Sequence, residues 1–141
     1  MFQNPFHERS SETLASVLNN APASIIVCSA KSRALLYANE RACKLFIKED
    51  YRPGITCYEA AGHGKPCPFC QYEEQNSLEF TVRNHMEPVT RRIYQISSKM
   101  IDWEGEPAYI EYIVDVTEDQ TKTERYRNRS EELDRTLCSI P

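Results

Sequence analysis

Three stretches in the second half of the chain alternate apolar and polar residues, which predicts three β-strands. In the first stretch Leu78, Phe80 and Val82 are separated by polar neighbours, so we expect a strand with these three side chains on its buried face. The same alternation at Tyr94–Met100 and Ala108–Val116 predicts two further strands.

The loops between these strands contain residues typical of turns. Asn84–Pro88 predicts a turn after the first strand, and Glu104–Gly105 fits a tight hairpin turn between the second and third. Earlier in the chain, Ser24–Ser29 and Ala34–Ala38 are short apolar runs on either side of a polar turn. We expect these two runs to form another hairpin.

Two helices are predicted in the first third of the chain. Leu14, Val17 and Leu18 have the i, i+3, i+4 spacing of one helical face. Asn39 is a good N-cap for a second helix over residues 40–46. Strands paired antiparallel, with helices segregated to one side, define an α+β domain. The expected boundaries are a flexible lead over 1–9, a domain over 10–120 and a charged exit helix or linker over 121–141.

The charged tail has a thin heptad pattern. Tyr126, Leu133 and Ile140 are seven residues apart, and Leu137 follows Leu133 by four. This spacing fits either a coiled coil or a solvated exit helix. Because the chain ends within this pattern, we expect it to be a fragment of a longer protein.

Composition narrows the class of protein. Hydrophobic residues make up 40% of the 141 residues, which indicates a globular domain. The net charge of −4 argues against nucleic-acid binding. No apolar run in this fragment approaches the roughly 20 residues needed to cross a bilayer, and the polar start does not resemble a signal peptide. We therefore expect a cytoplasmic protein.

The stretch Cys57–Cys70, C-Y-E-A-A-G-H-G-K-P-C-P-F-C, concentrates residues that carry chemistry. Cys57, His63, Cys67 and Cys70 are candidate ligands for zinc or an iron–sulfur cluster. Two other interpretations stay open: a reversible Cys67–Cys70 disulfide, or reduced thiols that pack as small apolar groups. Cys28 and Cys43 lie in a predicted strand and helix, where we expect core packing.

Four motifs resemble the PAS family of sensor domains. They are L-N-N-A-P-A-S-I-I-V at 18–27, Y-A-N-E at 37–40, W-E-G-E-P-A at 103–108 and D-V-T-E at 115–118. The cysteine stretch is similar to one found in a subset of PAS domains from bacterial signalling proteins. The resemblance implies a five-stranded antiparallel sheet in the order 2-1-5-4-3, with an N-terminal helix and a C-terminal exit helix.

The resemblance also implies a function. PAS domains sense small molecules, haem or flavin and pass the signal into a C-terminal helix. Here Asp115 and Thr117 match the output junction, which would feed a histidine kinase or a diguanylate cyclase in a longer chain. The family's flavin-photochemical motif N-C-R-F-L-Q is absent, and neither His63 nor His85 matches a haem-ligating helix position, which argues against both cofactors.

Phe80, Tyr94 and Tyr112 are candidates to line a ligand cavity, although aromatic side chains on sheets also serve as plain core. The sequence contains no hydrolase nucleophile elbow, phosphate-binding loop or zinc-protease motif, so we expect a non-enzymatic sensor. The alternative is a thiol–disulfide redox protein that uses Cys67 and Cys70. The apolar stripe at Leu14, Val17 and Leu18 further predicts a homodimer.

Overall fold

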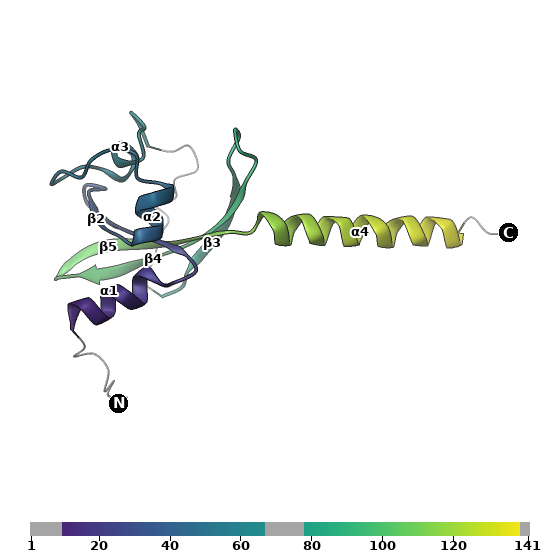
Figure 1. Ribbon diagram of the computed structural model, residues 1–141, viewed down its shortest axis with the longest axis horizontal. Coiled ribbons are helices and arrows are strands. Elements are labelled where there is room, and N and C mark those ends of the chain that lie inside the picture. The colour runs from purple at the N-terminus through teal and green to yellow at the C-terminus, as the bar shows by residue number, and fades with distance from the viewer. Residues whose placement is uncertain (1–9, 67–77, 139–141) are drawn as a thin grey trace.

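Five antiparallel strands form a single sheet in the order β2-β1-β5-β4-β3 (Figure 1). The computed structural model describes residues 10–66 and 78–138, and side chains as far as residue 133. The strands are β1 (Ser24–Ser29), β2 (Leu35–Ala38), β3 (Thr81–Met86), β4 (Ile93–Trp103) and β5 (Glu106–Asp115). The predicted α+β class and strand order are confirmed.

The helices are α1 (Ser11–Asn19), α2 (Glu40–Leu45), α3 (Cys57–Ala60) and α4 (Thr117–Cys138). The side chains of Ser10, Asn39 and Thr56 each accept a hydrogen bond from a backbone N–H in the first turn of the helix that follows. Helices α2 and α3 lie over one face of the sheet, α1 lies on the opposite side, and α4 extends away from the sheet (Figure 1).

The β4–β5 hairpin forms where the sequence predicts it. Glu104 and Gly105 both have positive φ angles, 50° and 88°, as the mirror-image turns that suit the twist of a β-hairpin require. This turn places Trp103 on β4 directly opposite Glu106 on β5. The pairing then continues in register to Tyr94 and Asp115.

Strand β3 differs from the prediction in its bounds and in its buried face. The strand runs to Met86, so Asn84–Met86 belong to it and the turn begins later than expected. Phe80 and Val82 are about half exposed, and Leu78 is largely exposed. The side chain of Arg83 lies inside instead, because Glu111 and Ser98 provide polar partners there.

A small core lies between the sheet and α3. Its buried members come from β1, β2, β5 and the segment around α3: Cys28, Leu35, Ile55, Ala60 and Tyr109. Cys28 is therefore a core residue, as predicted. The same prediction is wrong for Cys43, whose side chain is exposed on α2.

Asn39 connects α1, β1 and α2. Its Oδ1 accepts hydrogen bonds from the backbone N–H groups of Ile25 and Ala42, both at 3.0 Å. Its Nδ2 donates to the carbonyl oxygens of Leu18 at 2.9 Å and Ala23 at 3.0 Å. The predicted N-cap is confirmed, and the same side chain also holds the start of the sheet in place.

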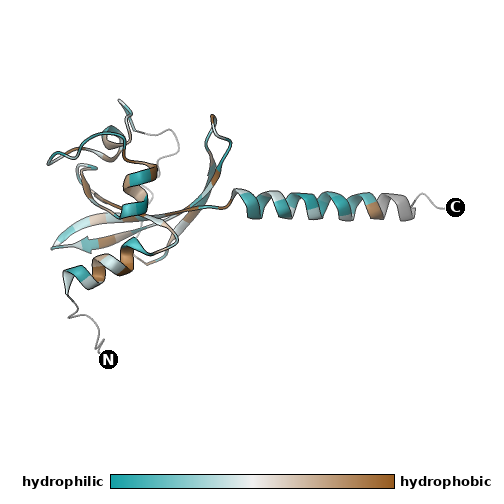
Figure 2. Cartoon of the chain, in the orientation of Figure 1, coloured by the Kyte–Doolittle hydropathy of each residue, from teal (hydrophilic) through white to brown (hydrophobic). Residues whose placement is uncertain are grey.

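Helix α4 begins at Thr117, four residues before the exit segment expected from sequence. Its side chains are exposed from Lys122 to Leu133, and hydrophilic colours dominate it in Figure 2. Among the described residues, no helix combines the length and the apolar character needed to cross a membrane.

Candidate functional site

The helix-covered face of the sheet carries sulfur-containing and polar side chains near its centre. In the sheet register Cys28 on β1 is opposite Tyr109 on β5, and Ser98 on β4 is opposite Glu111 on β5. Directly opposed residues in an antiparallel pair share one face. The contact between Cys57 and Tyr109 shows that this face is the one toward α3.

Backbone hydrogen bonds to the β1–β2 hairpin place Cys57 over this face. The N–H of Leu35 donates to the carbonyl oxygen of Ile55 at 2.7 Å, and the N–H of Cys57 donates to that of Arg33 at 3.0 Å. The chain then enters α3 with Cys57 as its first residue. Cys57 is consequently anchored to the edge of the sheet while its side chain turns inward.

Cys57 meets two other nucleophilic side chains at this position. Its Sγ lies 3.7 Å from the hydroxyl oxygen of Tyr109, and it packs against the core cluster that contains Cys28. Cys28 and Tyr109 are 1% and 2% exposed, whereas Cys57 is partly exposed. The three side chains form a cluster, called here the thiol–tyrosine cluster, with one member reachable from solvent.

Interactions within the cluster shift the pKa values of the two thiols in opposite directions. The hydrogen bond from Cys28, helped by Tyr109, lowers the pKa of Cys57 to about 7 despite its burial. The same hydrogen bond and burial raise the pKa of Cys28, and burial raises that of Tyr109. Cys57 is thus the member that ionises first, because its thiolate is the form that the neighbours stabilise.

A largely buried ion pair lies beside the cluster on the same face. Arg83 Nη2 is 4.0 Å from Glu111 Oε2, with side-chain exposures of 14% and 20%, and Arg83 Nη1 is 3.3 Å from Ser98 Oγ. Burial raises the pKa of Glu111, and the charge of Arg83 offsets part of that rise. The sheet face under the helices can therefore hold charged and hydrogen-bonding groups away from bulk water.

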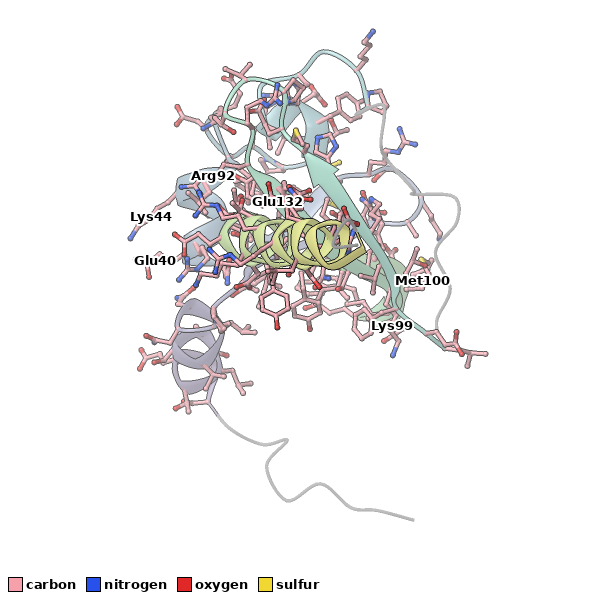
Figure 3. All side chains as sticks on the ribbon, turned by 90° about the vertical axis from the view of Figure 1, so that its right-hand side faces the viewer. Glu40, Lys44, Arg92, Lys99, Met100 and Glu132 are labelled. Carbon is pink, nitrogen blue, oxygen red and sulfur yellow. The ribbon has the colours of Figure 1, made fainter. Side chains whose placement is uncertain are left out.

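The three aromatic residues predicted to line a cavity lie on opposite faces of the sheet. Tyr94 packs edge-on against Phe46 at the end of α2, with ring centroids 5.5 Å apart. Phe80 packs against Tyr112 at 5.8 Å, and Lys99 Nζ lies 5.4 Å from the Phe80 centroid. Lys99 belongs to this second face, and its neighbour Met100 to the first (Figure 3). Ligand binding by the three aromatics stays a prediction.

Two of the four predicted metal ligands lie within the described residues. Cys57 belongs to the thiol–tyrosine cluster, whereas His63 is exposed in the turn after α3. Cys67 and Cys70 lie outside the described residues. In the part of the chain that the structure describes, no group of three or more histidine, cysteine or acidic side chains is arranged to hold a metal ion. The four-ligand site stays a prediction.

The predicted output residues form a hydrogen-bonded junction between β5 and α4. Asp115 Oδ1 accepts from the backbone N–H of Thr117 at 2.9 Å and from its hydroxyl at 2.6 Å. Thr117 Oγ1 in turn accepts from the N–H of Ile93 on β4 at 2.8 Å. The hydrogen bonds to Thr117 lower the pKa of Asp115, and Arg92, labelled in Figure 3, lies 3.6 Å from the carboxylate.

No protein-family model and no curated protein matches this sequence, but solved structures do. The chain is similar to the PAS domain of an HTR-like protein from Haloarcula marismortui (TM-score 0.51, 17% identity, 74% of this chain and 90% of that one). It is also similar to the PAS domain of Bordetella pertussis BvgS (TM-score 0.52, 19% identity, 86% of this chain and 96% of that one). A third similar structure is an RNA-binding light-oxygen-voltage receptor (TM-score 0.53, 16% identity, 93% of this chain and 41% of that one). The chain has a PAS fold.

Within this PAS fold, sequence analysis missed the residues that surround Cys57. Tyr109 and Glu111 lie between the apolar residues that predicted the last strand, and Arg83 directly follows Val82, the last apolar residue that predicted the first. These three residues occupy the polar positions of the alternating strand patterns. Alternate residues of a strand share a face, so the three lie on the same face of the sheet once the strands pair. Only the strand order brings Cys28 beside them.

Proposed function

We propose that this PAS-fold domain is the sensory input module of a bacterial signal-transduction protein. It detects a small ligand, a metal ion or a redox change and passes the signal through α4 to a histidine kinase or diguanylate cyclase. It carries out no catalysis itself, and it works in the cytoplasm, where thiols stay reduced. The observation that carries the proposal is that one strand, β5, connects the interior site to α4.

Strand β5 contributes Tyr109 and Glu111 to the helix-covered face and ends at Asp115. A change in the interior site therefore acts on the same strand that leads into the Asp115–Thr117 junction. The hydrogen bond from Ile93 to Thr117 also connects the start of α4 to β4. A shift of β5 relative to β4 would then change the direction in which α4 leaves the sheet.

Helix α4 suits a role in transmission. It is 22 residues long, and its apolar side chains Tyr126 and Leu133, seven residues apart, are 79% and 59% exposed. Most helices in proteins gain their stability from packing, so a partner surface would stabilise a helix as exposed as α4. A second copy of α4 in parallel would cover this heptad stripe.

Fusing the chain in front of a diguanylate cyclase catalytic domain tests the proposal. Insertions of one to seven alanine residues after Glu132 should make cyclase activity vary several-fold, with activity restored at seven, because a coiled coil repeats every seven residues. Activity that is independent of insertion length would show that α4 does not transmit a conformational signal.

The junction can be tested in the same fusion. Asp115→Ala removes both hydrogen bonds to Thr117 and should flatten the dependence on insertion length. Asp102→Ala is the matched control, since Asp102 also accepts a backbone N–H but lies at the β4–β5 turn. An equal effect of both substitutions would contradict a specific role of Asp115.

We also propose that the domain is a homodimer that buries α1. Leu14 and Val17 on α1 are 45% and 64% exposed, and Figure 2 shows hydrophobic residues along α1. A helix on the outer side of the sheet with such a stripe gains stability from a second copy of the same stripe.

Placing charges on this stripe should separate the dimer without unfolding the domain. Leu14→Glu with Val17→Glu is expected to weaken association at least tenfold in sedimentation experiments, because it would bury like charges against each other. Val89→Glu, at an exposed apolar position in the β3–β4 turn, is the control. A wild-type chain that sediments as a monomer at high concentration would refute the dimer.

A further inference from the structure

The structure brings together two cysteines that are 29 positions apart in the sequence. Cys28 is in strand β1, which lies between β2 and β5 in the sheet, and Cys57 begins α3. Cys57 Sγ lies 3.7 Å from the Tyr109 hydroxyl, Cys28 is opposite Tyr109 in the β1–β5 pairing, and both cysteines belong to the packed cluster that contains Tyr109. Two thiols in one packed cluster can carry out redox chemistry that a valine or alanine in the same space could not.

We propose that Cys28 and Cys57 are a redox-active pair that a hydroperoxide converts into a reversible disulfide between α3 and the sheet. This site differs from the Cys67–Cys70 pair considered from sequence. Its chemistry does not depend on the sensory role proposed above. Only its use as a signal rests on that role.

The positions of the two sulfurs assign their order of reaction. Cys57 is partly exposed, so a molecule as small as hydrogen peroxide can reach its Sγ, whereas Cys28 is 1% exposed and shielded by its neighbours. Cys57 is therefore the attacking thiol and Cys28 the resolving thiol. The Tyr109 hydroxyl, 3.7 Å from Cys57 Sγ, can donate a hydrogen bond to the sulfur while it is a thiolate.

The reaction balances with the hydroperoxide as the two-electron oxidant. The Cys57 thiolate attacks the terminal oxygen, the O–O bond breaks, and the alkoxide or hydroxide takes up a proton and leaves as alcohol or water. Cys57 is then a sulfenic acid. The Cys28 sulfur attacks Cys57 Sγ, its proton joins the departing hydroxide as water, and the S–S bond forms. A dithiol in solution reverses the step by thiol–disulfide exchange.

Bond formation requires the sulfurs to approach to about 2.05 Å, closer than a hydrogen bond allows. The part that must move is small, because α3 has only four residues. It is followed by a turn at Gly62, which has a φ angle of 87°. Movement of α3 toward β1 would break the contact between Cys57 and Tyr109, and Tyr109 lies on β5. Oxidation would thus alter the strand that leads into α4.

The test uses the full chain with Cys43, Cys67, Cys70 and Cys138 replaced by serine, which leaves only the proposed pair. The reduced protein is treated with hydrogen peroxide, its free thiols are blocked, and its peptides are analysed by mass spectrometry. We expect an intramolecular Cys28–Cys57 cross-link that dithiothreitol removes. Overoxidation of Cys57 to sulfinic acid with no cross-link would overturn the proposal.

Two further variants make the test decisive in the natural background. Cys57→Ser should leave Cys28 reduced under peroxide, while Cys43→Ser, which removes an exposed thiol on α2, should leave the cross-link unchanged. If peroxide instead links Cys57 to Cys67 or Cys70 in the wild-type chain, the assignment of Cys28 as partner is wrong. Because every readout is a covalent mass, these results stand whether or not the cyclase fusion responds.

Discussion

Replacing Asn39 with alanine is expected to destabilise the domain by about 3–5 kcal/mol, one of the two largest effects of a single substitution that we predict. The side chain is 1% exposed and makes four hydrogen bonds to backbone groups of three different segments. Alanine would leave buried N–H groups of Ile25 and Ala42 without their acceptor. Each such loss costs about 1 kcal/mol or more.

The matched control is Asn19→Ala. Asn19 Oδ1 also accepts a backbone N–H at the start of α2, from Glu40 at 2.9 Å, but its side chain is exposed. Water can replace this bond, so we expect a cost of about 0.5–1 kcal/mol. Urea unfolding of both variants measures the difference. Similar midpoints would mean that Asn39 acts only as a helix cap.

The sequence predicted the helix cap at Asn39 but not its other bonds. A cap is a local feature, because the N–H that it accepts is three residues away. The bonds to Ile25, Ala23 and Leu18 span 14 to 21 residues, and no pattern along the chain specifies them. Strand positions were predictable for the same local reason, since alternation is a property of neighbouring residues.

The face of an edge strand was not predictable from alternation alone. On β3 the apolar side chains Phe80 and Val82 are exposed, while Arg83 is inside. The pattern gave the period correctly but assigned the wrong face, because burial of Arg83 depends on Glu111, a residue 28 positions later. Edge strands of natural sheets often carry an inward-pointing charged residue, and Arg83 has that position on β3.

The candidate site was predictable only in part. Cys57, Asp115 and Thr117 stood out because each belongs to a short motif. Cys28 was assigned to packing, since a single cysteine in a strand carries no signal of its partner. Pairing of β1 with β5, together with the backbone bond between Cys57 and Arg33, brings the thiols together. Such a juxtaposition is a property of the strand order rather than of spacing.

The second large effect is expected for Arg83→Met, which should destabilise the domain by about 3–5 kcal/mol at pH 8. Methionine keeps most of the volume but removes the charge that faces Glu111 and the donor to Ser98. The carboxylate of Glu111 would remain largely buried without its guanidinium partner. Thermal or urea unfolding measures the loss.

This loss should depend on pH in a defined direction. Burial raises the pKa of Glu111 and Arg83 lowers it in part, so removing Arg83 raises this pKa further. A carboxyl group with a raised pKa in the folded state favours folding at low pH, and stability is lost as the pH rises through that pKa. Below about pH 4 a glutamate is protonated even when unfolded, so the deficit attributable to the charge should largely disappear there.

Two control variants test whether the loss of stability in Arg83→Met comes from the buried charge of Glu111. Arg92→Met removes an ion pair with Asp115 at a similar distance, 3.6 Å, but with side-chain exposures of 50% and 40%, so we expect a cost below about 1 kcal/mol. Adding Glu111→Gln to Arg83→Met removes the buried charge and should restore most of the stability at pH 8. A deficit in Arg83→Met that is constant from pH 4 to pH 8 would show that packing of the arginine side chain, rather than its charge, stabilises this face of the sheet.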